Sequence, residues 1–400
     1  MPGIPEIDLT DPTVIADPFG AHGRAREQAP LAQISSPGFG PFWATTRHDG
    51  AKRLLSDPRF VINSGSFQQL PGIPEHCRAY LRTMSEMDGP EHQRLRRLVS
   101  PAFTPRSAAA FRPRIERIVE SLLDDLDRHV EGGVVDLVPH FARPLPMDVI
   151  CELVGIPDAD RARWREYGAA VMTGYGPAFL AALPGIMDGA QAAVASRRED
   201  PDGDDVLAEL VRLQADDGDR SGTDGLGEVE LVTLVWHLVI AGQTPTNALA
   251  NGVAALLAHP DQLAALRADP ALMPGAVEEL LRWCGPQLMA VPRFAATDVE
   301  IEGVVVAAGQ PVTASIAGAN RDEAVFPDPE RLDVTRPAGA QLGFGHGPHY
   351  CLGAALAKVE CEVAFTALLR RYPRLAAAAA PERAPDPGTW RLVTLPVVLG

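Results

Sequence analysis

The sequence predicts a mainly α-helical protein with small β-sheets, an α+β chain that folds as a single large domain over residues 1–400. Apolar residues recur at three- or four-residue spacing along most of the chain, which is typical of amphipathic helices. Strand-like runs are few and short. The acidic, glycine-containing stretches 199–205 and 216–228 are too short to force a domain boundary, so one domain is favoured over two.

Nine segments carry the helical spacing, and clusters of Pro, Gly and Asp separate them. They are 49–56, 91–103, 107–130, 145–154, 158–174, 204–216, 228–257, 260–267 and 272–283. Five short runs predict strands, namely 31–34, 42–45, 299–306, 312–316 and 392–399. The segment that follows residue 353 also has a helical pattern.

The composition is that of an ordinary globular protein. Of 400 residues, 46% are hydrophobic and 22% are charged, which excludes disordered, collagen-like and disulfide-stapled classes. The 36 basic residues against 52 acidic ones give a net charge of −16, which argues against a nucleic-acid-binding protein. The five cysteines form no Cys-x-x-Cys pair, as expected in a reducing cytosol.

Neither a signal peptide nor a membrane span is predicted. The N-terminal residues include Asp and Pro where a signal peptide needs a basic start and an apolar run. The best membrane candidate, Leu231–Gly242, is twelve residues long, whereas a span needs about twenty. We therefore expect a cytoplasmic protein with no membrane partner.

The most informative stretch is Phe344–Gly353, with the sequence FGHGPHYCLG. Cys351 lies on a glycine-rich loop just ahead of a predicted helix, where backbone amides and the positive end of the helix favour a thiolate. Cys351 is therefore a candidate metal ligand or nucleophile, and a buried structural cysteine in a turn is the alternative. The whole stretch matches F-G-x-G-x-H-x-C-x-G and resembles the cytochrome P-450 family, in its soluble bacterial form of haem-thiolate monooxygenases.

This resemblance implies a cofactor and its ligands. The cofactor is expected to be haem b (iron protoporphyrin IX), with Cys351 as the axial iron ligand and His349 as a contact of a haem propionate. Phe344 can cover one side of the sulfur, and Gly345 and Gly353 permit close approach of a flat group. The implied architecture is the cytochrome P-450 fold, in which haem lies between a long oxygen-side helix and the cysteine loop.

A second stretch, Met87–Arg96, resembles the bacterial pattern D-P-P-E-H-x-R-L-R, with Gly89 where Pro is usual. His92 and Arg96 are four residues apart on a predicted helix, so both can reach one anion. Without this context each would be taken for a surface residue. The resemblance implies that these two side chains and Arg293 bind the haem propionates.

A third match concerns a structural triad. Glu279 and Arg282 fit the E-x-x-R pair of the family, and Arg331 fits the third member of its Glu-Arg-Arg triad. Residues three apart on a helix share one face and can pair. The implied role of the triad lies in folding and haem incorporation and not in catalysis.

The predicted oxygen-side helix departs from the family pattern A-G-x-(Asp/Glu)-Thr. The chain reads AGQTPT over Ala241–Thr246. Aligned from the alanine, Thr244 takes the acid position and Pro245 the alcohol position. With Thr246 as the alcohol, Pro245 takes the acid position and one residue is extra. In either alignment the carboxylate is absent.

Pro245 should open this helix. Because proline has no backbone N–H, the carbonyl of Ala241 loses its helical donor. A simple proline kink is the alternative to a functional opening. In the functional interpretation, polar side chains and ordered water supply protons at the opening, and the catalytic residues are Ala241, Gly242, Gln243, Thr244 and Thr246.

The resemblance also indicates which segments face the substrate. Their side chains are mostly apolar and include no clear charged anchor, which favours an apolar small-molecule substrate. The residues assigned to this pocket are Phe67, Met172, Phe179, Leu288, Met289, Val291 and Val393.

An arginine-rich stretch lies between residues 94 and 117, where seven arginines stand against one acid. A solvated helix face is one explanation. The other is a docking surface for an acidic electron donor, because the chain has no flavin or iron–sulfur segment of its own. The residues assigned to this surface are Arg94, Arg97 and Arg112, with ferredoxin and ferredoxin reductase as partners of a monomeric enzyme.

The leading functional hypothesis is oxidation of a small molecule by O2 and two electrons, as hydroxylation or epoxidation in bacterial secondary metabolism such as antibiotic biosynthesis. Because the carboxylate is missing, oxidative coupling of aromatic groups in a peptide-derived or aromatic metabolite is the first alternative. A haem-binding or haem-sensing protein without catalysis is the second, and the arginine-rich stretch argues against it.

Overall fold

Two units, each discontinuous in sequence, make up the fold. The computed structural model describes residues 4–36, 39–67, 71–172, 176–217 and 225–400. The first unit comprises Met1–Phe67, Asp125–Val138 and Asn247–Gly400, and the second comprises Gln68–Asp124 and Pro139–Thr246. The single domain over residues 1–400 stays a prediction, because two compact units of one chain can fold together or separately.

The first unit is built around a six-stranded mixed sheet in the order β1-β2-β3-β9-β6-β4. The β1/β2 and β3/β9 pairs are parallel and the other pairs are antiparallel. The strands are β1 (Glu6–Asp8), β2 (Leu31–Ser36), β3 (Phe39–Thr45), β4 (Phe60–Val61), β6 (Arg293–Ala295) and β9 (Pro311–Ala314).

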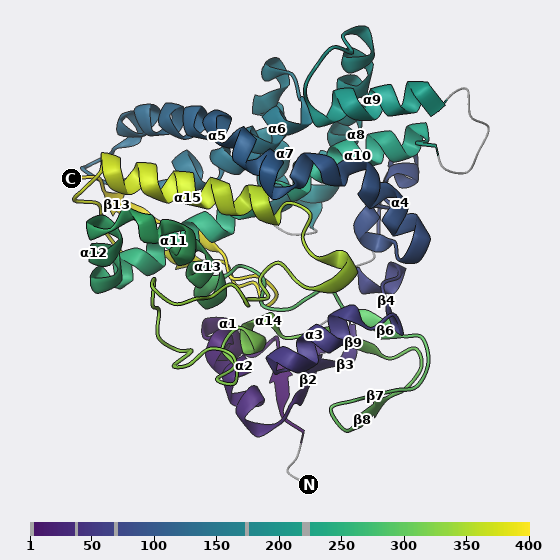
Figure 1. The fold of residues 1–400 in the computed structure, drawn as a ribbon, viewed down its shortest axis with the longest axis vertical. Helices are drawn as coiled ribbons and strands as arrows, with labels where there is room; N and C mark the ends of the chain where they lie inside the picture. Colours follow the sequence, from purple (N-terminus) through teal and green to yellow (C-terminus); the bar gives the residue numbers. More distant parts are fainter. Residues whose placement is uncertain (1–3, 37–38, 68–70, 173–175, 218–224) are drawn as a thin grey trace. The chain divides into compact units, whose positions relative to one another are not determined.

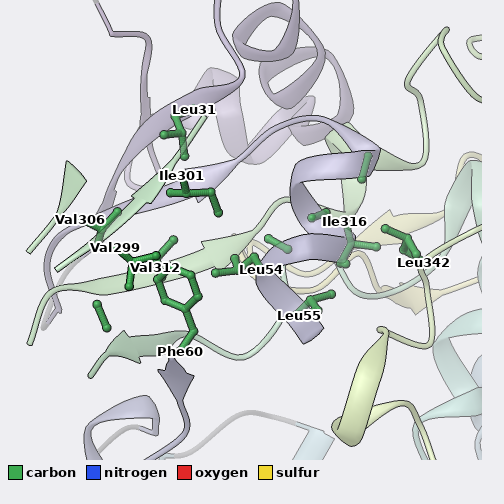
Figure 2. Close-up of a cluster of buried hydrophobic side chains, with 14 residues drawn as sticks. Leu31, Leu54, Leu55, Phe60, Val299, Ile301, Val306, Val312, Ile316 and Leu342 are labelled. Atoms are coloured by element: carbon green, nitrogen blue, oxygen red, sulfur yellow. The ribbon is translucent and has the colours of Figure 1, made fainter. Parts of the chain in front are cut away.

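A hydrophobic cluster packs α3 (His48–Ser56) against this sheet, as Figure 2 shows. Leu54 and Leu55 of the helix are buried in the same cluster as Phe60 and Val312 of two strands. Burying side chains of this size contributes about 1.5–3 kcal/mol each. Leu342 also belongs to the cluster, so the first residue of the loop that leads to Cys351 is held by the core.

The strand predicted over residues 299–306 is a hairpin of β7 (Val299–Ile301) and β8 (Val304–Val306). Its turn residues Glu302 and Gly303 have φ of 52° and 79°, a left-handed conformation that ends a strand. The valine-rich composition hides this turn in the sequence.

The strand predicted over 392–399 also divides, because the chain changes partners at Leu395. Its amide donates to Asp136 Oδ1 at 2.8 Å. The two parts join separate small sheets, ordered β11-β12 and β10-β13-β5. The strands are β5 (Val135–Asp136), β10 (Ala376–Ala377), β11 (Glu382–Arg383), β12 (Leu392–Thr394) and β13 (Pro396–Val398).

The helices of the first unit are labelled in Figure 1. Besides α3 they are α1 (Pro12–Ala16), α2 (Pro18–Gln28), α11 (Pro245–Ala258), α12 (Pro260–Ala268), α13 (Met273–Cys284), α14 (Ile316–Ala319) and α15 (Ala354–Arg371), of which α11 starts in the last two residues of the second unit. Short 3₁₀ turns are η1 (Ser64–Ser66), η5 (Asp127–His129), η7 (Pro270–Leu272) and η8 (Gly347–His349).

The second unit is almost entirely helical, and the predicted class of mainly helix with small sheets is confirmed. Its α-helices are α4 (Gly89–Val99), α5 (Pro105–Leu126), α6 (Pro144–Val154), α7 (Asp158–Met172), α8 (Pro177–Glu199), α9 (Val206–Asp217) and α10 (Glu228–Ala241). Its shorter turns are η2 (Glu75–Tyr80), η3 (Met84–Glu86), η4 (Ser100–Phe103) and a π-helical turn η6 (Val138–Ala142), whose first residue belongs to the first unit.

The sequence analysis missed α8, although it is 23 residues long. Pro184 and Gly185 lie in its interior and lower the helix propensity there. Packing on α7 overrides that preference, because a glycine at Gly185 leaves room for the Tyr167 hydroxyl to lie against the backbone of α8. Length and composition alone would also allow α8 to cross a membrane, a test that core helices of globular proteins pass as well.

Candidate active site

The cysteine loop Leu342–Cys351 is closed by its own backbone. The Gly345 amide donates to Leu342 O at 2.8 Å, and the Cys351 amide donates to Phe344 O at 2.9 Å. The Leu342 amide donates to Asn320 Oδ1 at 2.7 Å, which fixes the start of the loop. The loop therefore delivers Cys351 to the N-terminal end of α15 in a defined conformation, as the sequence predicts.

Cys351 differs from the other four cysteines in exposure. It is exposed, whereas Cys77, Cys151, Cys284 and Cys361 are buried. Burial raises the pKa of the Cys151 and Cys284 thiols to about 12 and that of Cys361 well above its usual value. Cys284 and Cys361 also line one small cavity of about 10 Å³, with room for a single water. Among the cysteines, Cys351 is the one that can offer a thiolate to a bound metal.

Glycine stands at two positions of the motif for different physical reasons. Gly347 has φ of +75°, and a Cβ there would lie 2.4 Å from the carbonyl oxygen of Leu55 on α3. Gly353 has φ of −83°, and a Cβ there would meet nothing within 4 Å. Neither backbone nor packing requires glycine at Gly353, so the space beside it fits a bound flat group such as haem.

Aromatic and charged side chains flank the loop. The rings of Phe344 and Tyr350 meet edge to face with centroids 6.3 Å apart. The ammonium group of Lys358 on α15 lies 5.5 Å from the Phe344 ring centroid and pairs with Glu278 on α13. This cation–π contact fixes the ring that the sequence expected to cover the sulfur. Lys358 and Tyr350 were not singled out from the sequence.

The Glu-Arg-Arg triad is present with a different third member. Glu279 and Arg282 are buried on α13, and Arg282 donates Nε to Glu279 Oε2 at 2.6 Å and Nη2 to Oε1 at 2.8 Å. The second guanidinium on Glu279 is that of Arg336, with Nε 3.1 Å from Oε1.

The assignment of Arg331 to this triad is therefore corrected. Its side chain is exposed, and its contribution is its backbone carbonyl, which accepts from Arg282 at 3.2 Å and from Arg336 at 3.1 Å. The two arginines lie five residues apart in an irregular segment. No local pattern distinguishes them, because the choice depends on how that segment wraps around Glu279.

The long apolar helix is interrupted where Pro245 predicts an opening. α10 ends at Ala241 and α11 begins at Pro245. The Ala241 carbonyl, which lacks its i+4 donor, accepts from the Thr244 hydroxyl at 2.8 Å and from the Thr244 amide at 3.2 Å. Gly242 permits close packing here, since a Cβ would lie 2.3 Å from Ile150 Cγ1 on α6. The predicted opening is confirmed, and Thr244 is the residue that caps it.

Thr246 and Gln243 lie beside this opening and are buried, at 2% and 4% exposed. Thr246 Oγ1 has no hydrogen-bond partner among the described residues. A buried hydroxyl without a partner costs about 1–3 kcal/mol, and a bound water or substrate group would satisfy it. The Thr244 hydroxyl, by contrast, already donates a hydrogen bond to the Ala241 carbonyl. This difference favours Thr246 as the alcohol of the family pattern.

The expected propionate ligands belong to both units. His92 and Arg96 lie one turn apart on α4 of the second unit, and His92 is buried. Arg293 is buried on β6 and His349 is half-buried in η8, both in the first unit. The predicted spacing of His92 and Arg96 on one helical face is confirmed, and their contact with a propionate stays a prediction.

The apolar residues assigned to the substrate pocket differ in exposure. Val291 and Val393 are each 41% exposed, and such surface is available to a ligand. Phe67 and Met289 are half-buried, Phe179 is buried on α8, and the side chain of Met172 lies outside the described residues. The assignment of Leu288 to the pocket is corrected, because this side chain is fully buried in a core cluster with Phe19 and Ala317 and presents no free surface.

The arginine-rich stretch is partly neutralised by acids from other helices. Arg94 pairs with Glu230 on α10, so its assignment to a free docking surface is corrected. Arg114 donates to Asp204 at 2.6 Å, and Arg117 lies 3.4 Å from Glu152. A count along the sequence misses these partners because they are distant in the chain. The exposed arginine of the three assigned is Arg97, while Arg112 is half-buried.

Comparisons with known proteins agree with this arrangement. A family model described as Cytochrome P450 matches residues 270–396. The chain is 39% identical over 386 residues to the cytochrome P450 monooxygenase PikC of Streptomyces venezuelae, covering 96% of this chain and 91% of PikC. It is 40% identical over 364 residues to mycinamicin IV hydroxylase/epoxidase of Micromonospora griseorubida, covering 88% of each chain.

A solved structure extends the likeness to the whole fold. Cytochrome P450 PksS of Bacillus subtilis 168 superposes with a TM-score of 0.87 at 33% identity, covering 98% of this chain and 99% of PksS. Proteins of this family bind haem b through a cysteine thiolate, and the exposed Cys351 sulfur and the open space at Gly353 fit that cofactor. With such identity over nearly its whole length, the chain belongs to the cytochrome P450 family of monooxygenases.

Proposed function

We propose that this monooxygenase hydroxylates or epoxidises a mostly apolar small molecule in bacterial secondary metabolism. Two relatives support the reaction type by name, since one is a monooxygenase and the other a hydroxylase/epoxidase of mycinamicin IV. The exposed valines Val291 and Val393 support an apolar substrate. We further propose a cytoplasmic monomer, in keeping with the sequence.

The observation that carries this proposal is the environment of Cys351. It is the exposed cysteine, on a loop closed by backbone hydrogen bonds at the N-terminal end of α15. Helix dipole and loop amides favour its thiolate, which would hold the haem iron. Haem bound through a thiolate supplies the chemistry that cleaves O2 and transfers one oxygen atom to the substrate. Phe344, Gly345 and Gly353 would line the cofactor, and His92, Arg96, Arg293 and His349 would bind its propionates.

Protons for the reaction would come from residues at the helix opening. The Thr246 hydroxyl is buried and unpartnered among the described residues, so it can hold a water. Gln243, whose backbone carbonyl accepts from the Thr246 amide at 3.0 Å, is buried and can hold a second water. Neither side chain ionises at neutral pH, so the protons would pass through the waters that the two side chains hold, and neither side chain would act as an acid itself.

Electrons would come from a ferredoxin reduced by a ferredoxin reductase. Arg97 is exposed on α4 and Arg112 is half-buried on α5, and both carry positive charge on a chain of net charge −16. A local positive surface is needed to attract an acidic donor to an acidic protein. Arg94 does not belong to this surface because Glu230 neutralises it.

Reconstituted holoenzyme tests the proposal. Purified protein with ferredoxin, ferredoxin reductase and a panel of apolar natural products should yield products heavier by one oxygen atom. The ferrous carbonyl should show the strongly red-shifted Soret band of thiolate ligation, and Cys351→His should lose both that band and the product. Cys361→Ala is the matched control and should keep both. Loss of the band in Cys361→Ala with its retention in Cys351→His would overturn the ligand assignment.

A further inference from the structure

A histidine and a serine that the sequence analysis did not single out form a pair in the second unit. His237 lies on α10 and Ser85 lies in the turn η3, and His237 Nε2 is 3.1 Å from Ser85 Oγ. The other ring nitrogen, Nδ1, is buried and has no hydrogen-bond partner in the part of the chain that the structure describes. The proposed function gives this pair no role.

The unequal surroundings of the two nitrogens select one tautomer. Burial lowers the pKa of His237 to about 4, so the ring is neutral at pH 7. A neutral imidazole has one N–H donor and one acceptor nitrogen. A buried N–H without a partner is rarer and costlier than a buried acceptor without one. The proton therefore belongs on Nε2, which donates to Ser85 Oγ, and Nδ1 keeps the lone pair.

This assignment leaves the serine proton free. When Ser85 Oγ accepts from His237, its own O–H cannot donate to Nε2 and must point elsewhere. Ser85 is half-buried, so its hydroxyl is neither enclosed by protein nor fully hydrated. The pair thus presents one hydrogen-bond donor and no charge.

The position of the hydroxyl is fixed from two sides. The Tyr80 carbonyl accepts from Trp236 Nε1 at 2.9 Å and from the Thr233 hydroxyl at 3.2 Å, which ties the chain ahead of η3 to α10. In η3 itself, Thr83 and Glu86 form a capping box. A donor held in this way loses little conformational entropy when it binds a partner.

The pair lies one helical turn from the opening at Ala241. Residues 233, 237 and 241 are four apart and share one face of α10. Along this face Thr233 is buried, His237 is half-buried and Ala241 is exposed, so solvent exposure of the face increases toward the helix interruption. A group bound beside Ala241 could therefore extend to the hydroxyl of Ser85.

We propose that Ser85, oriented by His237, donates a hydrogen bond to a neutral oxygen acceptor of the substrate, namely a carbonyl, ether or hydroxyl oxygen. This inference rests on the proposed function, in which the Ala241–Thr246 stretch faces the reaction. Ser85 is the binding residue, and His237 is a positioning residue that acts through it. The contact would fix which carbon of an otherwise apolar substrate is presented for oxidation.

Two probes of the same shape test the donor. Cyclododecanone has a C=O group where methylenecyclododecane has C=CH2, so their affinities for ferric holoenzyme, measured by spectral titration and calorimetry, isolate the hydrogen bond. Wild type should bind the ketone about tenfold more tightly, the effect of one such bond. Ser85→Ala should remove the preference without weakening binding of the alkene. Ser100→Ala, which removes a hydroxyl bonded to Arg96 O, should keep the preference.

The positioning role has its own readout. His237→Leu should lose most of the ketone preference, and His237→Gln should restore it because its amide can donate from the Nε2 position. Nitrogen NMR of wild type should report a neutral Nε2–H tautomer at pH 7. A wild type without ketone preference, an unchanged preference in Ser85→Ala, or an Nδ1–H tautomer would each overturn the inference. A chain that keeps the preference but forms no oxygenated product would remove the proposed function and leave this contact standing.

Discussion

At the scale of single residues, identity alone does not tell what a side chain does. Arg331 and Arg336 have the same charge and lie five residues apart, yet one contributes a carbonyl and the other a guanidinium to the buried Glu279. His22 is buried beside Ser315, with Nδ1 2.7 Å from its hydroxyl, so a residue that usually titrates near neutral pH is held in its neutral form. Both cases lead to measurable differences.

The arginine pair predicts unequal losses of stability. Arg336→Ala removes one of the two guanidinium groups on a buried carboxylate and should lower the free energy of unfolding by about 2–3 kcal/mol. Arg331→Ala keeps the backbone carbonyl that the triad uses and should cost within about 0.5 kcal/mol. Guanidinium unfolding of the holoenzyme followed by circular dichroism measures both. Equal losses, or a larger loss in Arg331→Ala, would contradict the corrected triad.

His22 predicts a loss of stability in acid. Burial lowers its pKa from 6.5 to about 4 in the folded chain, so the unfolded chain takes up the proton first as pH falls. Its stabilising contribution is therefore complete above pH 6.5 and is lost as pH falls toward 4. Between pH 7 and pH 5 the loss should be about 2 kcal/mol.

Comparison with His22→Asn isolates this effect. Asparagine keeps a polar atom near the position of Nδ1 but does not titrate, so the variant should be less stable at pH 7 and less sensitive to acid than wild type. Urea unfolding at the two pH values gives the difference. His76→Asn, at an exposed position, is the control and should behave as wild type. The same pH dependence in His22→Asn and wild type would rule out His22 as the source.

At the scale of elements, the interruption between α10 and α11 joins local structure to function. Pro245 removes one donor, Thr244 replaces it, and Thr246 is left buried with an unpartnered hydroxyl among the described residues. The two threonines should therefore respond differently to the same substitution.

Thr246→Val should raise stability and impair function together. Valine has nearly the same shape and removes the unsatisfied hydroxyl, so the free energy of unfolding should rise by about 1 kcal/mol. The product formed per O2 consumed should fall by roughly tenfold or more, because the proposed proton relay loses its hydroxyl. Thr244→Val removes a capping bond instead and should lower stability by about 1 kcal/mol while coupling changes little. Product analysis together with an oxygen electrode measures the product formed per O2 consumed. A larger fall of this ratio in Thr244→Val than in Thr246→Val would assign the relay to Thr244.

At the scale of the whole molecule, charge is the property that local structure does not set. A chain of net charge −16 repels an acidic donor at long range, and the arginines of α4 and α5 work against that repulsion. Part of their charge is already neutralised within the second unit, since Arg94 and Arg114 form ion pairs with acids there.

Arg97→Glu should therefore slow reduction by an acidic ferredoxin at low ionic strength, by several fold in the association rate. The difference from wild type should vanish near 0.5 M salt, where the screening length is only about 4 Å. Arg267→Glu makes the same change in net charge at an exposed position on α12 and is the control. Stopped-flow reduction measures the rates. If Arg267→Glu slows the reaction as much as Arg97→Glu, net charge and not a docking surface governs the encounter.

The sequence by itself determined the features that depend on neighbouring residues: the predominance of helix, the glycine-rich loop that presents Cys351, and the opening at Pro245, which follows from a missing N–H. Only the tertiary structure decided which distant groups meet. It brought Arg336 to Glu279, Glu230 to Arg94, Phe19 to Leu288 and Ser85 to His237. The physical reason is that a turn, a cap or a helix break is a short-range property of the backbone. A buried charge or hydroxyl instead takes its partner from whichever segment the packing of the core carries to it.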